Sequence, residues 1–207
     1  MGVGERGHLF LLIGPSGSGK TTLIQEMCRR FDRLRFLPTV TTRPPRPHEV
    51  NGREYDFVTH AEFEALTRAG ALLEWQEIHG NLYGTSRLRL AEAIDRGVLG
   101  ITSVDVFGGT RVRAAFPDDS TAIFVRPSSV TELRERLLTR GGASHDDIEV
   151  RLARVEMELA QAGQSDYAVV NDNGRLAEAA DQLASILTRW LGPPSVGGAL
   201  ASRPGEE

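Results

Sequence analysis

The residues best suited to chemistry form one glycine-rich run near the N-terminus. Residues 14–21 read GPSGSGKT, which matches G-x4-G-K-[ST] in full, directly after an apolar run and at the expected start of a helix. Glycines let backbone N–H groups surround phosphate oxygens, and a helix N-terminus adds positive potential. Lys20 is expected to reach the β- and γ-phosphates, and the Thr21 hydroxyl to ligate Mg²⁺. The run therefore predicts a P-loop for a nucleoside triphosphate.

Lys20 stands out because it is the only lysine among 24 basic residues, the other 23 being arginine. A chain that uses arginine nearly everywhere still has lysine here, which suggests that this position needs a compact point charge. The P-loop alone fits GTPases, ATPases and kinases, so it does not name a reaction. The residues predicted to contact ATP in this segment are Gly14, Pro15, Ser16, Gly17, Ser18, Gly19, Lys20, Thr21 and Thr22.

The elements that must position these residues alternate between apolar runs and amphipathic segments. Strands are expected at 8–13, 35–40, 55–58, 72–78, 98–104, 121–125 and 167–170. Helices are expected at 20–31, 61–69, 87–96, 129–139, 146–161 and 175–191, with a further short helix after 104. The alternation predicts an α/β fold of three layers, in which helices flank both faces of a parallel sheet.

Composition and charge narrow the class of protein. A chain of 207 residues fits one globular domain, and its net charge of −4 gives no global basic field that would attract nucleic acid. The sequence has no run of 18 apolar residues and no signal-peptide pattern, so we expect no membrane span and a cytoplasmic protein. Cys28 is the only cysteine, and the histidines lack metal-ligand spacing.

Five segments, in this order, resemble guanylate kinase: GPSGSGKTTL, TTRPPRPHEVNGREYDFV, EWQEIHGNLYGTS, RLLTRGG and YAVVND. The resemblance covers about residues 9–191 and implies phosphoryl transfer from ATP to GMP and dGMP, with Mg²⁺ as the cofactor. It also implies a domain over 1–191 that contains a core (about 8–38 and 98–191), a small acceptor-binding insert (about 39–87) and a helical lid (about 134–151). The Pro-, Gly- and Ser-rich tail, 192–207, is expected to be disordered.

Two arginines in the second of these segments are suited to an acceptor phosphate. Arg43 and Arg46 lie three positions apart in a proline-stiffened loop, where their fork-shaped donors can clamp a dianion. The hydroxyls of Tyr55 and Tyr83 are expected to complete the cradle, as matching tyrosines do in the family.

Glu74 is expected to select the base. Guanine presents N1–H and N2–H₂ side by side, and one carboxylate can accept both hydrogen bonds. Adenine has an unprotonated N1 there, so a buried glutamate would lose its partner, at a cost of about 1–3 kcal/mol. The resemblance also places three residues around the guanine: Thr39, Thr85 and Asp105.

The donor side requires positive charge during transfer. Residues 133–151 resemble the family's lid, which closes over ATP and expels water. By resemblance Arg140 lies near the adenine, Arg151 bridges the phosphates, and Asn171 contacts the adenine or its loop, while Arg136 and Arg154 are further candidates. The predicted catalytic residues are Lys20, Arg43, Arg140 and Arg151.

Three positions depart from the family's pattern. Ser103 replaces a common acidic residue that helps to organise Mg²⁺, Phe107 replaces a glutamine, and Arg126 replaces a proline. These changes leave open a kinase for a modified nucleotide or for ribose bisphosphate on the same scaffold. A binding module without catalysis is a second alternative, although such modules typically have a damaged P-loop. The expected partners are small-molecule nucleotides, ATP and GMP, and the expected state is a monomer or homodimer.

Overall fold

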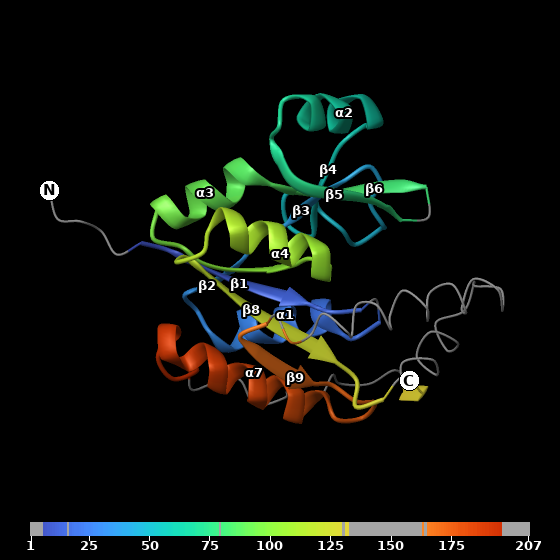
Figure 1. Cartoon of the computed structure of the whole chain (residues 1–207). Helices are drawn as coiled ribbons and strands as arrows, with labels where there is room; N and C mark the ends of the chain where they lie inside the picture. Colours follow the sequence, from blue (N-terminus) through green and yellow to red (C-terminus); the bar gives the residue numbers. More distant parts are fainter. Residues whose placement is uncertain are drawn as a thin grey trace, which may run out of the picture.

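The computed structural model describes residues 6–15, 17–78, 80–129, 131–132, 163 and 165–195. The described strands form two sheets, a larger one of five strands and a smaller one of four (Figure 1). The larger sheet consists of β1 (His8–Ile13), β2 (Leu34–Phe36), β7 (Leu99–Ser103), β8 (Ser120–Arg126) and β9 (Tyr167–Val170). The smaller sheet consists of β3 (Thr39–Thr41), β4 (Tyr55–Phe57), β5 (Leu72–Ile78) and β6 (Asn81–Ser86). The described helices are α1 (Lys20–Arg30), α2 (His60–Arg68), α3 (Arg87–Asp95), α4 (Val106–Ala115) and α7 (Leu176–Leu191).

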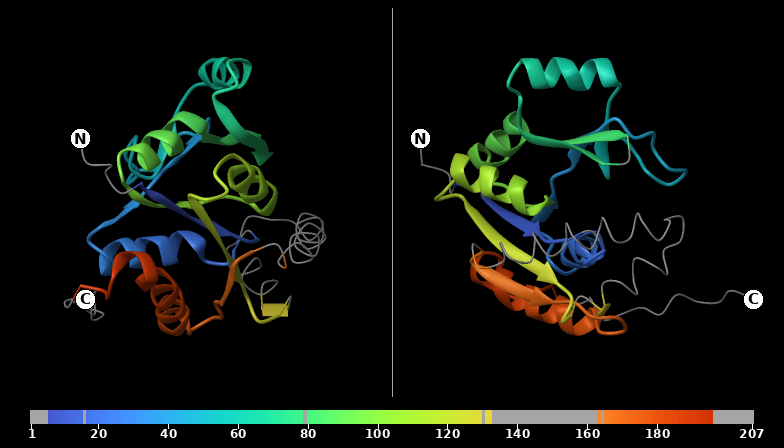
Figure 2. Two further views of the ribbon diagram at one scale, coloured as in Figure 1. Left: turned by 60° about the vertical axis from the view of Figure 1, so that its left-hand side comes forward. Right: turned by 45° about the vertical axis from the view of Figure 1, so that its right-hand side comes forward.

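The larger sheet is parallel throughout, in the order β2-β7-β1-β8-β9, so that β1 lies at its centre. Side chains on β1 alternate between two buried layers because successive residues of a strand point to opposite faces. Phe10 and Leu12 pack with α1 and α7, whereas Leu9, Leu11 and Ile13 pack with α3 and α4. Figure 2 shows the same layering from two further sides. The predicted three-layer fold with helices on both faces of a parallel sheet is confirmed.

The smaller sheet has the order β4-β3-β6-β5. Its β3–β4 pair is parallel, and β6 pairs antiparallel with β3 and with β5. Helix α2 covers it, beginning at a capping box in which Thr59 and Glu62 bond each other's backbone N–H groups, and it buries Phe63. β6 is not among the strands expected from the sequence. A Cβ at Gly84 would lie only 3.1 Å from the Phe63 ring, so close packing at a glycine, and not an apolar run, defines this strand.

The predicted strand 35–40 is wrong as a single element. It divides into β2, at the edge of the larger sheet, and β3, within the smaller one. Between them the Leu37 N–H donates to the carbonyl of Ile101 and the Leu37 carbonyl accepts from the Thr102 hydroxyl at 2.8 Å. Pro38 follows and has no N–H to donate, so the ladder ends there and the chain crosses to the other sheet.

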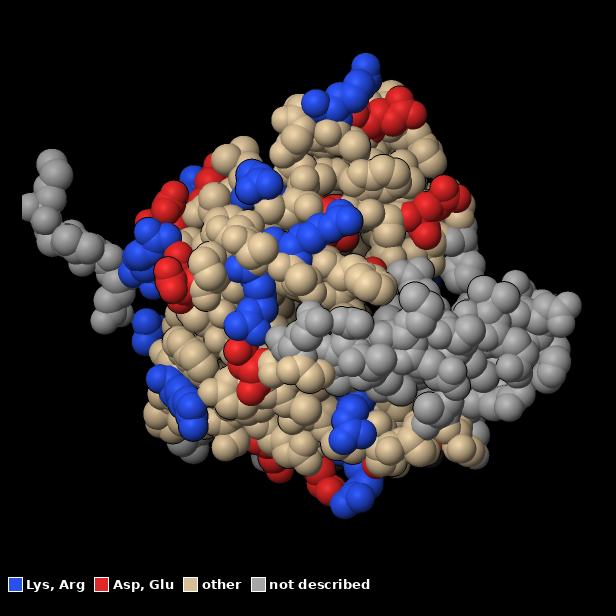
Figure 3. Space-filling view, viewed as in Figure 1, with Lys and Arg blue, Asp and Glu red and all other residues tan. Residues whose placement is uncertain are grey.

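The remaining predicted elements agree with the structure to within a few residues at their ends. The expected helices 129–139 and 146–161 lie almost entirely outside the described residues, as does the tail beyond residue 195. Ser195 is described, and its N–H donates to the carbonyl of Arg30 at the end of α1. Within the described part of the chain, no helix has the length and apolarity needed to cross a membrane. Figure 3 shows basic and acidic side chains interspersed on the face it displays.

His8 gives the fold a pH-dependent contribution to stability. Its ring lies 5.3 Å from the Trp190 ring and 5.2 Å from the Phe10 ring, and its Nε2 is hydrogen-bonded to the Thr121 hydroxyl at 2.8 Å. Burial lowers the pKa of His8, against the smaller opposing effect of Asp119. The unfolded chain therefore binds the proton more readily, and this contribution to stability is present above pH ~6.5 and is lost as pH falls through the folded pKa.

We expect His8→Gln to flatten the pH dependence of the free energy of unfolding in the interval below pH ~6.5. Thr121→Val is the control, because it removes the hydrogen bond and leaves the buried imidazole in place. Urea unfolding of the three proteins at a series of pH values measures the effect. Equal slopes for wild type and His8→Gln would contradict this assignment.

Candidate active site

The P-loop joins β1 to α1 in a conformation that its glycines make possible. Gly14, Gly17 and Gly19 have positive φ angles of 136°, 88° and 90°. A Cβ at Gly14 would lie 2.1 Å from the carbonyl oxygen of Val125, so a side chain there would collide with β8. The loop therefore packs directly against β8, and its backbone leads into the start of α1.

Lys20 lies inside this loop. Its ammonium group donates to the carbonyls of Gly14 at 2.6 Å and Pro15 at 3.0 Å, which holds the charge over the loop backbone. Lys20 is also the first residue of α1, whose N-cap, Gly19, supplies no side-chain hydrogen bond. Thr21 and Thr22 follow in the exposed first turn. Lysine, helix N-terminus and hydroxyls thus converge on one place, which is the chemistry of a phosphate site.

Ser18 is the polar residue of the loop whose environment needs explaining. The residue is fully buried, and its hydroxyl oxygen has no hydrogen-bond partner among the described residues. Leaving a buried hydroxyl without a partner costs about 1–3 kcal/mol. A phosphate oxygen of a bound nucleotide would supply that partner.

Asn171, at the carboxyl end of β9, holds the P-loop from the opposite side. Its side chain is 5% exposed, and its Nδ2 donates to the Ser18 carbonyl at 2.8 Å. A Cβ at Gly19 would approach the same Nδ2 to 2.2 Å, so the glycine makes room for the amide. The Asn171 N–H in turn donates to the carbonyl of Arg126 at 2.9 Å. Asn171 therefore contacts the P-loop directly, and its expected contact with the adenine or its loop stays a prediction.

The smaller sheet and its loops carry the residues predicted to bind the acceptor. Arg43 lies in the loop after β3, with its guanidinium carbon 5.4 Å from the centre of the Tyr55 ring and 5.6 Å from that of Phe57. Tyr55 on β4 and Tyr83 on β6 lie on the two strands that pair with β3, and their ring centres are 6.0 Å apart. Thr39 on β3 is paired with Tyr55. Burial raises the pKa of Tyr55, so its hydroxyl stays a neutral donor. Four predicted residues therefore lie close together: Thr39, Arg43, Tyr55 and Tyr83. Arg46 is exposed in the same loop as Arg43.

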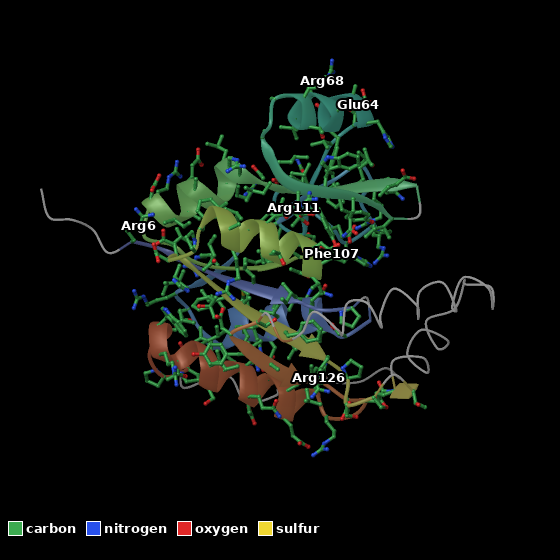
Figure 4. All side chains as sticks on the ribbon, in the orientation of Figure 1. Arg6, Glu64, Arg68, Phe107, Arg111 and Arg126 are labelled. Carbon is green, nitrogen blue, oxygen red and sulfur yellow. The ribbon has the colours of Figure 1, made fainter. Side chains whose placement is uncertain are left out.

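Glu74 lies on β5 and faces α4. The residue is 9% exposed, and its Oε1 accepts the Thr85 hydroxyl at 2.5 Å from the neighbouring strand. Burial is the main cause that raises the pKa of Glu74; Asp105 raises it further, while Thr85 and Arg111 lower it. Figure 4 labels Arg111 on α4, below the smaller sheet. A buried carboxylate with a hydroxyl on one oxygen is suited to bind a pair of N–H donors.

The approach of α4 to Glu74 depends on a glycine. A Cβ at Gly108 would lie 2.9 Å from the Glu74 carboxyl carbon and 3.0 Å from Oδ1 of Asp105. Asp105 is the N-cap of α4, and its Oδ1 accepts the Gly108 N–H at 2.6 Å. One glycine therefore lets the start of α4, its cap Asp105 and the Glu74 carboxylate meet. Three of the predicted base-binding residues, Glu74, Thr85 and Asp105, thus lie in one place.

Not every predicted residue can be placed. Arg136, Arg140, Arg151 and Arg154, the lid at about 134–151, and Ser16 lie outside the described residues. The three departures are all described: Ser103 ends β7, Phe107 is 47% exposed on α4, and Arg126 ends β8 (Figure 4). Ser103 is paired with Leu12 of β1, beside the strand that leads into the P-loop.

Sequence reasoning missed residues that position the predicted ones. Thr41 is fully buried, and its hydroxyl accepts the Arg43 N–H at 3.1 Å. Glu49 pairs with Arg43, and Gly108 admits Glu74. The signal for Glu49 was present, since it is an acidic residue in a loop already assigned two arginines. Gly108 gave no signal, because its importance arises from a partner 34 positions earlier in the sequence.

A parallel sheet with a P-loop after its central strand, and a second sheet that holds arginine, tyrosines and a buried carboxylate, define a P-loop kinase. The model of the guanylate kinase family matches residues 6–190. The chain therefore belongs to the guanylate kinase family.

Individual relatives agree with this assignment. The chain is 40% identical to the guanylate kinase of Thermotoga maritima over 182 residues, which cover 88% of this chain and 86% of the relative. It is 42% identical to that of Thermus thermophilus over 185 residues, which cover 89% and 81%. The crystal structure of guanylate kinase from Anaplasma phagocytophilum matches with a TM-score of 0.69 and 28% identity, covering 91% of this chain and 88% of that one.

We expect Asn171→Ala to weaken the binding of MgATP by about tenfold, because the Ser18 carbonyl loses its donor. Asn173→Ala, two residues further along the same loop, is the matched control. Inorganic tripolyphosphate, which has no adenine, separates two roles of the residue. If Asn171 acts through the P-loop, Asn171→Ala weakens the binding of tripolyphosphate by the same factor as that of MgATP. Isothermal titration measures the affinity for both ligands. Wild-type affinity of Asn171→Ala for both would contradict the role of this contact.

Proposed function

We propose that this protein is a nucleoside monophosphate kinase that transfers the γ-phosphoryl group of ATP to GMP and dGMP, forming GDP and dGDP. The observation that carries the proposal is the buried Glu74 carboxylate, with Thr85 on one oxygen and the first turn of α4 against it. Relatives named guanylate kinase, at 40% identity or more over most of the chain, support the same activity.

Glu74 supplies the selection of the base. An ionised carboxylate offers about four lone-pair positions, of which the Thr85 hydroxyl uses one. The N1–H and N2–H₂ groups of guanine supply two further donors at adjacent positions. Adenine presents an unprotonated N1 to the same place, so AMP would leave the buried carboxylate without its partners. Thr39 and Asp105 complete the proposed base site.

Arg43, Arg46, Tyr55 and Tyr83 supply the proposed site for the acceptor phosphate. Aromatic rings around the Arg43 guanidinium limit its contact with water, which strengthens its attraction for a dianion. An oxygen of that phosphate is already a competent nucleophile, so direct in-line transfer needs no covalent enzyme intermediate and no protein base. On the donor side Lys20 and the P-loop backbone hold the triphosphate, with Arg136, Arg140 and Arg151 proposed to close over it.

Mg²⁺ fits the residues at the start of α1. Within the described residues no three His, Cys, Asp or Glu side chains form a metal cluster. Mg²⁺ in phosphoryl-transfer sites keeps several waters and takes few protein ligands beside the substrate's phosphates, so the exposed Thr21 hydroxyl is a sufficient ligand. When bound, Mg²⁺ neutralises charge on the phosphate oxygens. Ser103 is neutral where the family pattern described above has an acidic residue, so we propose that Mg²⁺ here depends more on the phosphates themselves.

The two alternatives are less well supported. A binding module needs no lysine held in the P-loop, and a ribose bisphosphate kinase has no base for the buried Glu74 to bind. We propose nucleotides as the only substrates, a cytoplasmic location, and a monomer or homodimer.

The direct test is an ADP-release assay with MgATP against GMP, dGMP, AMP, CMP, UMP and ribose 1,5-bisphosphate. We expect turnover with GMP and dGMP, and a loss of at least about 100-fold in Lys20→Ala, since that variant removes the positive charge that stabilises the transferred phosphoryl group. Turnover of another acceptor in place of GMP would refute the proposed substrate. Near-normal turnover by Lys20→Ala would refute the role of the P-loop.

Glu74→Gln tests the selection of the base separately. We expect kcat/KM for GMP to fall by about 10- to 100-fold, because the amide N–H₂ would face the donors of guanine. The preference for GMP over AMP falls with it. Glu77→Gln, on the exposed side of the same strand, is the matched control and keeps the wild-type preference. An unchanged preference in Glu74→Gln would contradict this role.

A further inference from the structure

Glu49, in the loop between β3 and β4, has a carboxylate divided between two partners. Its Oε1 accepts Nη2 of Arg43 at 2.8 Å, and its Oε2 accepts the backbone N–H of Arg46 at 2.8 Å. The Glu49 N–H donates back to the Arg46 carbonyl at 2.9 Å. One side chain thus connects the two arginines that the proposed function assigns to the acceptor phosphate.

The pair between Glu49 and Arg43 is sheltered from water. The Glu49 and Arg43 side chains are 14% and 16% exposed, whereas those of Arg53 and Glu54, paired in the same loop, are 63% and 28% exposed. The hydrogen bond to Arg43 is the largest cause that lowers the pKa of Glu49, so the carboxylate stays ionised at neutral pH. Sheltered, charge-assisted hydrogen bonds hold their geometry better than exposed ion pairs.

Arg43 is held on several sides. Glu49 holds Nη2, the Pro44 carbonyl accepts Nη1 at 2.8 Å, and the rings of Tyr55 and Phe57 lie within 5.6 Å of the guanidinium carbon. These two hydrogen bonds use two of the five N–H donors of a guanidinium, which leaves others to be directed at an anion. A guanidinium ordered before binding loses less rotamer freedom when the anion arrives.

Two opposite effects on an anion follow from Glu49. Its negative charge repels a phosphate, and its hydrogen bonds keep Arg43 and Arg46 oriented. The Arg43 guanidinium, in direct contact with the carboxylate, offsets this repulsion, whereas the orienting effect acts on the groups that contact the phosphate. The second effect is therefore expected to dominate.

We propose that Glu49 is a positioning residue for the acceptor phosphate, which fixes the Arg43 guanidinium and the Arg46 backbone in the arrangement that binds the phosphate of GMP. The inference rests on the proposed function and extends it to a residue that does not itself contact the nucleotide.

The test compares Glu49→Gln with Glu54→Gln. Glu54 is a matched control because its carboxylate likewise accepts a backbone N–H, that of Val50 at 2.7 Å, and an arginine, Arg53 at 2.6 Å, in the same loop. Titration of GMP and of guanosine into both variants and the wild type separates the phosphate from the base.

We expect Glu49→Gln to weaken GMP binding on the order of tenfold and to change guanosine binding by less than about twofold. In kinetics we expect KM for GMP to rise by a similar factor, with KM for ATP unchanged. Glu54→Gln leaves all of these values as in the wild type. In an Arg43→Ala background, Glu49→Gln has little further effect, because the residue acts largely through Arg43.

Several results would overturn the inference. Unchanged GMP affinity in Glu49→Gln would show that the carboxylate has no effect on phosphate binding. Tighter binding would show that its repulsion of the phosphate dominates. Equal loss for GMP and guanosine would make it a general structural support of the smaller sheet. Additive losses in the Arg43→Ala background would separate it from the arginine. A wild type that neither binds nor turns over GMP would instead refute the proposed function, and this inference with it.

Discussion

The contact between Glu74 and the start of α4 connects the two sheets, and the candidate site depends on it. The larger sheet carries the P-loop, the smaller sheet carries the arginines and tyrosines, and neither alone holds both halves of a transfer reaction. Glu74 on β5 meets Asp105 and Gly108 on the helix that follows β7. Because a Cβ at residue 108 would lie 2.9 Å from the Glu74 carboxyl carbon, α4 can approach β5 this closely only with glycine at that position.

The larger sheet explains why the remaining groups lie near this contact. All of its strands are parallel, so their carboxyl ends share one edge, where ligands of open α/β sheets bind. The P-loop follows β1, Asp105 follows β7, and Asn171 follows β9. β2 and β7 lie on one side of β1, and β8 and β9 lie on the other, so the P-loop follows the strand at which the strand order changes side. The smaller sheet, inserted in the chain between β2 and β7, then brings the residues proposed to bind the acceptor over that edge.

Much of this arrangement could be predicted from the sequence, where local signals were strong. The P-loop, the buried strand before it and the helix after it each have a pattern that depends on near neighbours. The smaller sheet was harder to predict. β6 contains Gly84, and its packing against Phe63 leaves no periodic pattern of apolar residues in the sequence. The division of residues 35–40 at Pro38 depends on which sheet each half joins. Strand pairing depends on residues far apart in the sequence, whereas secondary-structure propensity depends on near neighbours.

The single lysine has a chemical consequence beyond phosphate binding. Apart from the α-amino group, Lys20 carries the only primary amine of the chain, and its ammonium group lies among the carbonyls of the P-loop. Reagents or enzymes that acylate amines would therefore find one ε-amino group, and modifying it would remove the charge from the loop. Amine coupling, which labels many positions on most protein surfaces, would here reach Lys20 and the N-terminus, and a label on Lys20 would remove the charge from the P-loop.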